Sequence, residues 1–105
     1  MPKRIAFRMN LNAGEAAEYE KRHDEVFPEL AQALTDAGVS DYSIWWDYQT
    51  NHLFATLLLA ENNTLDELPD TEICQRWWAF MADIMETDSK NVPTQVPLRQ
   101  VFHLP

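Results

Sequence analysis

Three segments of this chain place apolar side chains at every second position, which restricts each of them to an extended strand with one buried face. The alternation is complete over residues 4 to 11 and recurs over 41 to 47 and 97 to 104. A fourth segment, residues 52 to 59, is apolar on both faces, which is typical of a strand inside a sheet. The chain therefore predicts four strands.

Two helices are expected between these strands, and the first is the longer. Apolar residues recur every three or four positions from residue 16 to residue 34, and Ala37-Gly38 predicts a helix end, because glycine readily takes the left-handed cap conformation. Asn12 followed by Glu15 resembles a side-chain cap at the start. Pro28 lies inside this helix, where it removes a hydrogen bond and predicts a kink.

The second helix is expected over residues 70 to 85, with an apolar stripe along one face. Thr64 with Glu67 suggests an earlier helix start, and Pro69-Asp70 forms a boundary before the main helix. A polar loop that contains proline, residues 88 to 97, then leads to the last strand.

The element order is thus βαββαβ, which predicts an α+β, ferredoxin-like domain over residues 1–105. In this plan four antiparallel strands form one sheet, and two helices cover one of its faces. The other face would leave large apolar side chains in water, and exposed apolar patches of this kind usually mark an interface. A homodimer that packs sheet against sheet is therefore expected, since two-fold pairs are the commonest oligomers.

The charge balance excludes several classes of partner. The net charge is -9 with eight Lys and Arg residues, so neither nucleic acid nor an anionic membrane surface is expected to bind. Cys74 is the single cysteine, which precludes an internal disulfide and favours a reducing, cytoplasmic compartment. The N-terminus lacks the apolar core of a signal peptide, and no apolar run approaches the roughly 20 residues that span a bilayer.

Two short motifs carry the candidate chemistry. Tyr19 and His23 lie four residues apart, so one helical turn places both rings on the same face. Trp77-Trp78 adds two large flat surfaces on the second helix. A titratable imidazole, a phenol and indole walls suit a site that handles a sugar. The alternative for His23 is an ordinary surface position, because charged residues flank it on both sides.

With these motifs the chain resembles the L-rhamnose mutarotases. Arg22-His23 and Pro28-Glu29-Leu30 are similar to the first-helix motif of that family, and Cys74-Gln75-Arg76-Trp77-Trp78 is the most specific match, because two consecutive tryptophans are rare. Further matches follow in order along the chain: Tyr42, Asp47, Asn51, Leu53-Phe54-Ala55, Val101-Phe102 and Leu104-Pro105. Several motifs in the right order and spacing make this resemblance strong.

The resemblance implies an isomerase without a cofactor that interconverts the α and β anomers of L-rhamnose, which is 6-deoxy-L-mannose. It implies that His23 is the proton donor and that Tyr19, Tyr42, Trp77 and Trp78 hold the sugar. It also implies a dimeric α+β barrel. Opening the ring requires a proton on the ring oxygen and the loss of one from the anomeric hydroxyl, and a histidine with a reference pKa of about 6.5 suits both transfers.

The complementary base stays open at this point. Glu29, Asp47 and Asp24 are candidates by location, and a bound water or a sugar hydroxyl could serve instead. Arg76 either bridges sugar hydroxyls or pairs with a carboxylate. A metal site is not expected, because no histidine or cysteine pair has the spacing of metal ligands.

Two other functions fit the same fold. One is a cofactor-independent monooxygenase that uses the tryptophan-lined pocket and the histidine on an aromatic substrate, since a scaffold alone does not fix its chemistry. The other is a non-catalytic dimeric module that binds a small molecule. Trp45-Trp46 and His103 depart from the mutarotase pattern, and if either lines the pocket the preferred sugar could differ.

Overall fold

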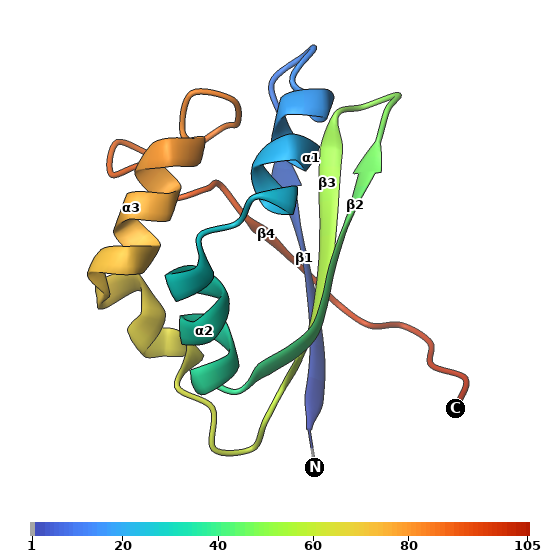
Figure 1. The fold of residues 1–105 in the computed structure, drawn as a ribbon. Helices are drawn as coiled ribbons and strands as arrows, with labels where there is room; N and C mark the ends of the chain where they lie inside the picture. Colours follow the sequence, from blue (N-terminus) through green and yellow to red (C-terminus); the bar gives the residue numbers. More distant parts are fainter. Residues whose placement is uncertain (1) are drawn as a thin grey trace.

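The computed structural model describes residues 2–105, which form one sheet and a layer of helices (Figure 1). In chain order the elements are β1 (Lys3–Asn10), α1 (Ala16–Asp24), α2 (Pro28–Asp36), β2 (Val39–Asp47), β3 (His52–Leu59), the 3-10 helix η1 (Leu65–Asp70), α3 (Glu72–Met81) and β4 (Val96–Leu98). The predicted α+β class is confirmed, and so are strands in all four predicted places.

The strands form an antiparallel sheet in the order β2-β3-β1-β4. β1 and β3 pair along their whole length, from Lys3 opposite Leu59 to Asn10 opposite His52. The first and third strands therefore lie at the centre, as two interlocked split βαβ units require. The four-stranded antiparallel sheet predicted from the element order is confirmed.

The helices cover one face of the sheet, and the core lies between the two layers (Figure 1). In β3 every second residue is buried: Leu53, Ala55 and Leu57 are at most 3% exposed. Their partners in β1 project to the same side because directly opposed residues share a face. The helical layer and the segment after it complete the core with Tyr19, Leu30, Trp77, Met81, Ile84 and Met85.

The first predicted helix is in fact two helices, α1 and α2. The expectation that two helices cover the sheet is therefore wrong, because α3 is a third. α1 ends at Asp24 and α2 begins at Pro28, so residues 25–27 are not helical. Pro28 lies in the first turn of α2, where its missing N–H would have had no helical partner. The apolar periodicity continues across residues 25–27, so this pattern could not reveal the break. Figure 1 shows α1 and α2 as two separate coils joined by a short non-helical link.

The expected side-chain cap at the start of the first helix is wrong. Asn12 donates from Nδ2 to the carbonyl oxygen of Asp83 at 3.3 Å, and α1 begins with no side-chain cap. η1 starts next to Thr64 as expected, but it also lacks such a cap. α3 is capped by Thr71, whose Oγ1 accepts from the Cys74 amide at 3.3 Å. α3 ends at Met81, four residues before the predicted end.

Gly38 ends α2 as predicted. Its φ of +95° lies in the left-handed region, and a Cβ there would come within 3.0 Å of the Asn63 Cβ. The Gly38 carbonyl also accepts from the Ala60 amide at 2.9 Å. Glycine is therefore required both by the backbone angle and by the close approach of the loop that follows β3.

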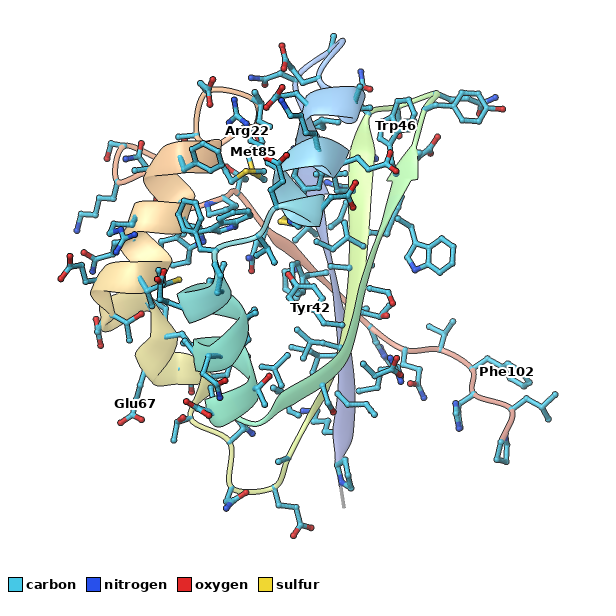
Figure 2. The ribbon with its side chains drawn as sticks, viewed as in Figure 1. Arg22, Tyr42, Trp46, Glu67, Met85 and Phe102 are labelled. Atoms are coloured by element: carbon cyan, nitrogen blue, oxygen red, sulfur yellow. The ribbon has the colours of Figure 1, made fainter. Side chains whose placement is uncertain are left out.

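The last predicted strand is wrong in its extent. The alternation predicts it over residues 97 to 104, but β4 covers only Val96–Leu98. These three residues pair with β1, and the chain then leaves the edge of the sheet. Residues 99–105 consequently lack a neighbouring strand to supply backbone partners. Figure 2 shows this segment, with Phe102, extending away from the body, and Val101, Phe102 and Leu104 are between 76% and 89% exposed.

Within residues 2–105, no helix has the length and apolar character needed to cross a bilayer. Cys74 is a free thiol that is buried in the protein. The cytoplasmic location stays a prediction.

Candidate active site

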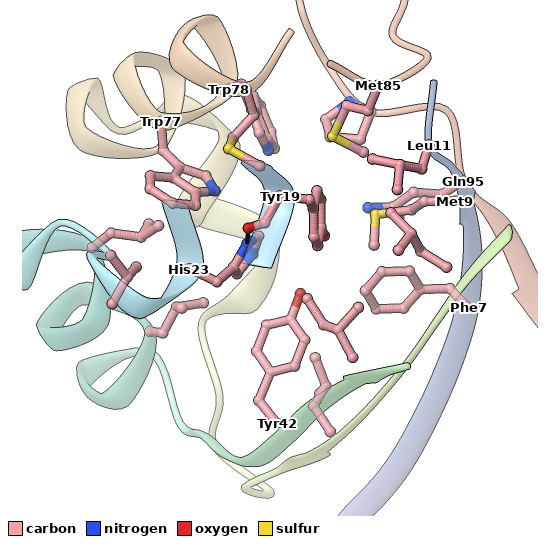
Figure 3. A pocket seen from close by; sticks show the side chains of 18 of the residues that line it. Phe7, Met9, Leu11, Tyr19, His23, Tyr42, Trp77, Trp78, Met85 and Gln95 are labelled. Carbon is pink, nitrogen blue, oxygen red and sulfur yellow. Dashed lines mark hydrogen bonds between the residues drawn. The ribbon is translucent and has the colours of Figure 1, made fainter. Parts of the chain in front are cut away.

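A cavity of about 1470 Å³ lies between the helices and the covered face of the sheet (Figure 3). The residues expected at the site all lie on its wall: Tyr19, His23, Tyr42, Trp77 and Trp78. They come from α1, β2 and α3, so the fold brings together residues that are far apart in the sequence. Small-molecule pockets usually measure roughly 300–1,000 Å³, so this cavity is larger than a typical ligand site.

Tyr19 and His23 share one face of α1, as their spacing predicts. Their ring centroids are 4.3 Å apart with an angle of 31° between the planes. His23 Nδ1 lies 3.0 Å from the backbone oxygen of Tyr19, and Figure 3 draws this hydrogen bond. A carbonyl oxygen can only accept, so Nδ1 carries the proton and Nε2 is left to exchange one with a ligand. The hydrogen bond that orients the imidazole thus goes to the Tyr19 backbone, and the Tyr19 ring packs against the imidazole.

The surroundings of His23 favour the neutral imidazole. Burial lowers the pKa of His23 below its usual 6.5, and the hydrogen bond to the Tyr19 backbone opposes this only in part. At neutral pH most of the imidazole is therefore uncharged, with a lone pair on Nε2. Such a group can first accept a proton and then return it.

Trp77 and Trp78 form a wall on the α3 side of the cavity. The Trp77 indole is 8% exposed and stands edge-on to the imidazole, with centroids 5.3 Å apart and planes at 88°. Phe27 packs against the same indole at 5.0 Å. Trp77 thus belongs to both the core and the pocket, whereas Trp78 is half-buried on the wall. Aromatic packing on Trp77 and Tyr19 restricts the imidazole from two sides.

A β-bulge directs Tyr42 into the cavity. Ser40 pairs with Leu58 and Ser43 with Thr56, so Asp41 and Tyr42 together oppose one residue of β3. Before the bulge the odd-numbered Val39 is buried, and after it the even-numbered Tyr42 and Ile44 line the cavity. The extra residue therefore reverses which positions face the helices. Asp41 supplies it in the left-handed conformation, with a φ of +47°.

The two phenols of the site stay protonated. Burial raises the pKa of the Tyr42 phenol to about 12, and its hydroxyl points toward the middle of the pocket in Figure 3. Burial, followed by the nearby Tyr42, also raises the pKa of Tyr19 above its usual value. Both hydroxyls can donate as well as accept hydrogen bonds at neutral pH. Burial likewise raises the pKa of the Cys74 thiol to about 11, which argues against a nucleophilic role.

The three candidate bases have different positions. Asp24 lines the cavity, whereas Glu29 and Asp47 are not among the described residues of its wall. The Asp47 carboxylate accepts from the Gln49 amide at 2.9 Å, and this bond lowers the pKa of Asp47. Asp47 therefore stabilises the turn between β2 and β3.

Arg76 and His103 lie away from the cavity, whereas Trp46 is on its wall. Arg76 is exposed, with its guanidinium 5.8 Å from the Phe27 ring centroid. His103 lies in the exposed C-terminal segment. Trp46 lines the cavity and donates from Nε1 to Asn51 Oδ1 at 3.2 Å.

Two polar residues of the wall, Gln95 and Asp66, could not be found from sequence patterns. Gln95 is polar and lies in the loop before β4, and Figure 3 shows it among the side chains that line the pocket. Asp66 lines the cavity from η1. A lone glutamine or aspartate in a polar segment looks like any surface residue, so only the fold could place them here.

Among the described residues, no three His, Cys, Asp or Glu side chains are grouped so that they could hold a metal ion.

Comparison with known proteins places this arrangement in a family. A sequence model of the L-rhamnose mutarotase family matches residues 4–104. The chain is 54% identical to the L-rhamnose mutarotase of Acidiphilium cryptum over 96% of its own length and 97% of that protein. It is 52% identical to the L-rhamnose mutarotase of Mesorhizobium japonicum over 99% of both chains. The chain belongs to the L-rhamnose mutarotase family.

The tertiary structure agrees with membership in the L-rhamnose mutarotase family. A crystal structure of L-rhamnose mutarotase from Formosa agariphila superposes with a TM-score of 0.92 at 45% identity, covering 98% of this chain and 99% of that one. The resemblance inferred from the motifs is therefore confirmed, and the chain is an isomerase by family. The matched region includes α1, β2 and α3, which carry the expected site residues.

The bulge at Asp41 gives a prediction for stability. In Asp41→Val, a β-branched residue must adopt a positive φ, which costs about 1–3 kcal/mol. Asp41→Gly is the matched control, because it removes the same carboxylate and its ion pair with Arg4 but accepts the backbone angle. Urea unfolding should show Asp41→Val to be less stable than Asp41→Gly by about this amount. Equal stability would show that residue 41 does not need the left-handed conformation.

Proposed function

We propose that this chain interconverts the α and β anomers of L-rhamnose, with His23 as the group that moves the proton. The observation that supports this role most strongly is the hydrogen bond from His23 Nδ1 to the Tyr19 backbone, which leaves Nε2 to act in the cavity. Family membership supports the substrate, because the relatives are L-rhamnose mutarotases.

Ring opening proceeds by two proton transfers at one nitrogen. Neutral His23 Nε2 takes the proton of the anomeric hydroxyl O1, the C1–O1 bond becomes a carbonyl, and the C1–O5 bond breaks. The imidazolium then gives the proton to O5, so His23 is the proton donor to the ring oxygen. O1 and O5 are attached to the same carbon, which brings both within reach of one imidazole. Positioned proton transfer of this kind contributes roughly 10²–10⁴-fold.

Closure on the opposite face of the aldehyde reverses these steps. Rotation about the C1–C2 bond presents the other face of the carbonyl to O5, Nε2 takes the O5 proton, and O1 receives it. Tyr19, Tyr42, Trp77 and Trp78 hold the sugar during this rotation. The indoles offer flat apolar surfaces to the C–H face and the C6 methyl group, and the phenols offer hydrogen bonds to hydroxyls.

The other two functions have less support. A monooxygenase or a non-catalytic binding module would share the fold, but the sequence matches over nearly the whole chain are to isomerases. The proposed transfer also needs no separate base, because His23 performs both halves of the exchange.

Replacing the imidazole provides the main test of this function. NMR exchange spectroscopy on equilibrated L-rhamnose should show faster α/β exchange with the wild-type protein, and His23→Ala should lose most of that acceleration, by roughly 10²–10⁴-fold. The control is Tyr48→Ala, an exposed aromatic residue in the turn after β2. Unchanged exchange in a folded His23→Ala protein would reject the role of His23. No acceleration by the wild type would reject the function.

The pH dependence tests the starting protonation state. Because the neutral imidazole begins the reaction, the acceleration should fall as the pH drops through the pKa of His23, which burial places below 6.5. The exchange rate of L-rhamnose is measured from pH 4.5 to 8, and the rate without protein is subtracted at each pH. A rate that falls with rising pH through this pKa would mean that the imidazolium starts the reaction.

The uncovered sheet face supports the predicted homodimer. Trp45 opposes Phe54 across the β2–β3 pair, and Val96 and Leu98 oppose residues of β1 that point away from the helices. Trp45 is 67% exposed, and Val96 and Leu98 are 38% and 40% exposed. On the same face the buried Nε atom of Arg8 lacks a hydrogen-bond partner within residues 2–105. We infer that a second copy covers this face and that two sheets pack as a dimeric α+β barrel.

Substitution on the uncovered face tests the dimer. Sedimentation equilibrium should give the mass of two chains for the wild type, and Trp45→Glu should shift the mass toward one chain because a charge would be buried between the sheets. Tyr48→Glu is the matched control, since Tyr48 is 74% exposed but lies in the turn beyond the strands. A wild-type protein that sediments as one chain at every concentration would contradict the dimer.

A further inference from the structure

Arg22 precedes His23 in the sequence but points out of the cavity, toward α3. Its side chain is only 14% exposed, whereas those of its carboxylate partners Glu18 and Asp83 are 41% and 68% exposed. Arg22 is not among the residues that line the cavity, so it does not contact a sugar bound there. Figure 2 shows Arg22 near the place where α1 meets the end of α3.

The guanidinium donates hydrogen bonds both within α1 and to the end of α3. Nε donates to Glu18 Oε2 at 2.8 Å within α1. Nη1 donates to the backbone oxygen of Phe80 at 2.7 Å and to Asp83 Oδ1 at 2.8 Å. The Phe80 oxygen belongs to the last turn of α3, where carbonyl groups have no partner in the helix and attract cations. Arg22 therefore caps α3 with a side chain from α1.

The same guanidinium also stacks on an aromatic cluster formed by Phe27, Trp77 and Phe80. Its central carbon lies 4.6 Å from the centroid of the Phe80 ring, and Phe80 packs against Trp77 at 5.8 Å. Trp77 in turn stands 5.3 Å from the His23 imidazole. A continuous set of contacts thus runs from Arg22 through Phe80 and Trp77 to the His23 imidazole.

We propose that Arg22 is a positioning residue for the isomerase reaction, which sets the separation between the His23 imidazole on α1 and the indole wall on α3. The proposal rests on the proposed role of His23. Errors of about 1 Å in the placement of a catalytic group can cost roughly 10²-fold in rate. A link that holds two helices at a fixed separation therefore affects the rate more than the affinity for the sugar.

Lysine should not replace Arg22 fully. A lysine ammonium could still pair with Asp83, but it lacks the planar fork that serves Glu18, the Phe80 carbonyl and Asp83 together. It also lacks the flat surface that stacks on Phe80.

The loop after α3 is also held by a second hydrogen bond, because the backbone amide of Asn12 donates to the Ile84 carbonyl oxygen at 2.9 Å. This bond should keep the Arg22 variants folded.

The test compares Arg22→Met and Arg22→Lys with Arg76→Met. Arg76 is the matched control because its guanidinium also lies over a ring of the same cluster, 5.8 Å from the Phe27 centroid, but it points to solvent. NMR exchange rates at several L-rhamnose concentrations give kcat and KM. We expect Arg22→Met to lower kcat roughly 10- to 100-fold with KM changed less than about 3-fold. The kcat of Arg22→Lys should lie between those of Arg22→Met and the wild type, and Arg76→Met should match the wild type.

A second measurement does not depend on activity. The Hε1 chemical shift of His23 reports ring currents from Tyr19 and Trp77, and it should move toward its value in urea-unfolded protein in Arg22→Met but not in Arg76→Met. An unchanged shift together with an unchanged kcat overturns the proposal, and so does a rise in KM alone. If the wild type itself fails to accelerate exchange, the proposed function fails, and the shift alone still decides whether Arg22 positions the imidazole.

Discussion

The hydrogen bond between His23 Nδ1 and the Tyr19 carbonyl oxygen fixes the group on which the proposed chemistry depends. It holds the proton on one ring nitrogen and leaves the other with a lone pair. Because the bond joins residues one helical turn apart, α1 alone can form it. The rest of the fold has to place this ring inside a cavity and bring apolar walls to it.

Three features of the fold do so. The break before Pro28 separates α1 from α2, so the helix that carries His23 is independent of the one that follows. The bulge at Asp41 reverses the facing of β2 and directs Tyr42 into the cavity. Arg22 joins α1 to the end of α3, which carries the indoles. Each feature orients an element that carries one part of the site.

Sequence patterns predicted most of this fold because the patterns are local. Alternation over residues 4 to 11 and the order of periodicities gave the strands and the sheet, and Gly38 marked the end of a helix. Predictions failed where a pattern had two interpretations. Asn12 has the type of a capping residue but binds the Asp83 carbonyl, and the alternation predicted over residues 97 to 104 continues past β4 without a neighbouring strand in the chain.

The sequence by itself determined which chemical groups exist and which of them share a helical turn, as Tyr19 and His23 do, because neighbours four residues apart meet in any helix. Only the tertiary structure decided that Tyr42 faces the cavity, that Gln95 reaches its wall and that Arg22 caps α3. These outcomes depend on strand register and on contacts between segments distant in the chain. Such contacts are set by packing the whole core, and no short stretch of residues encodes them.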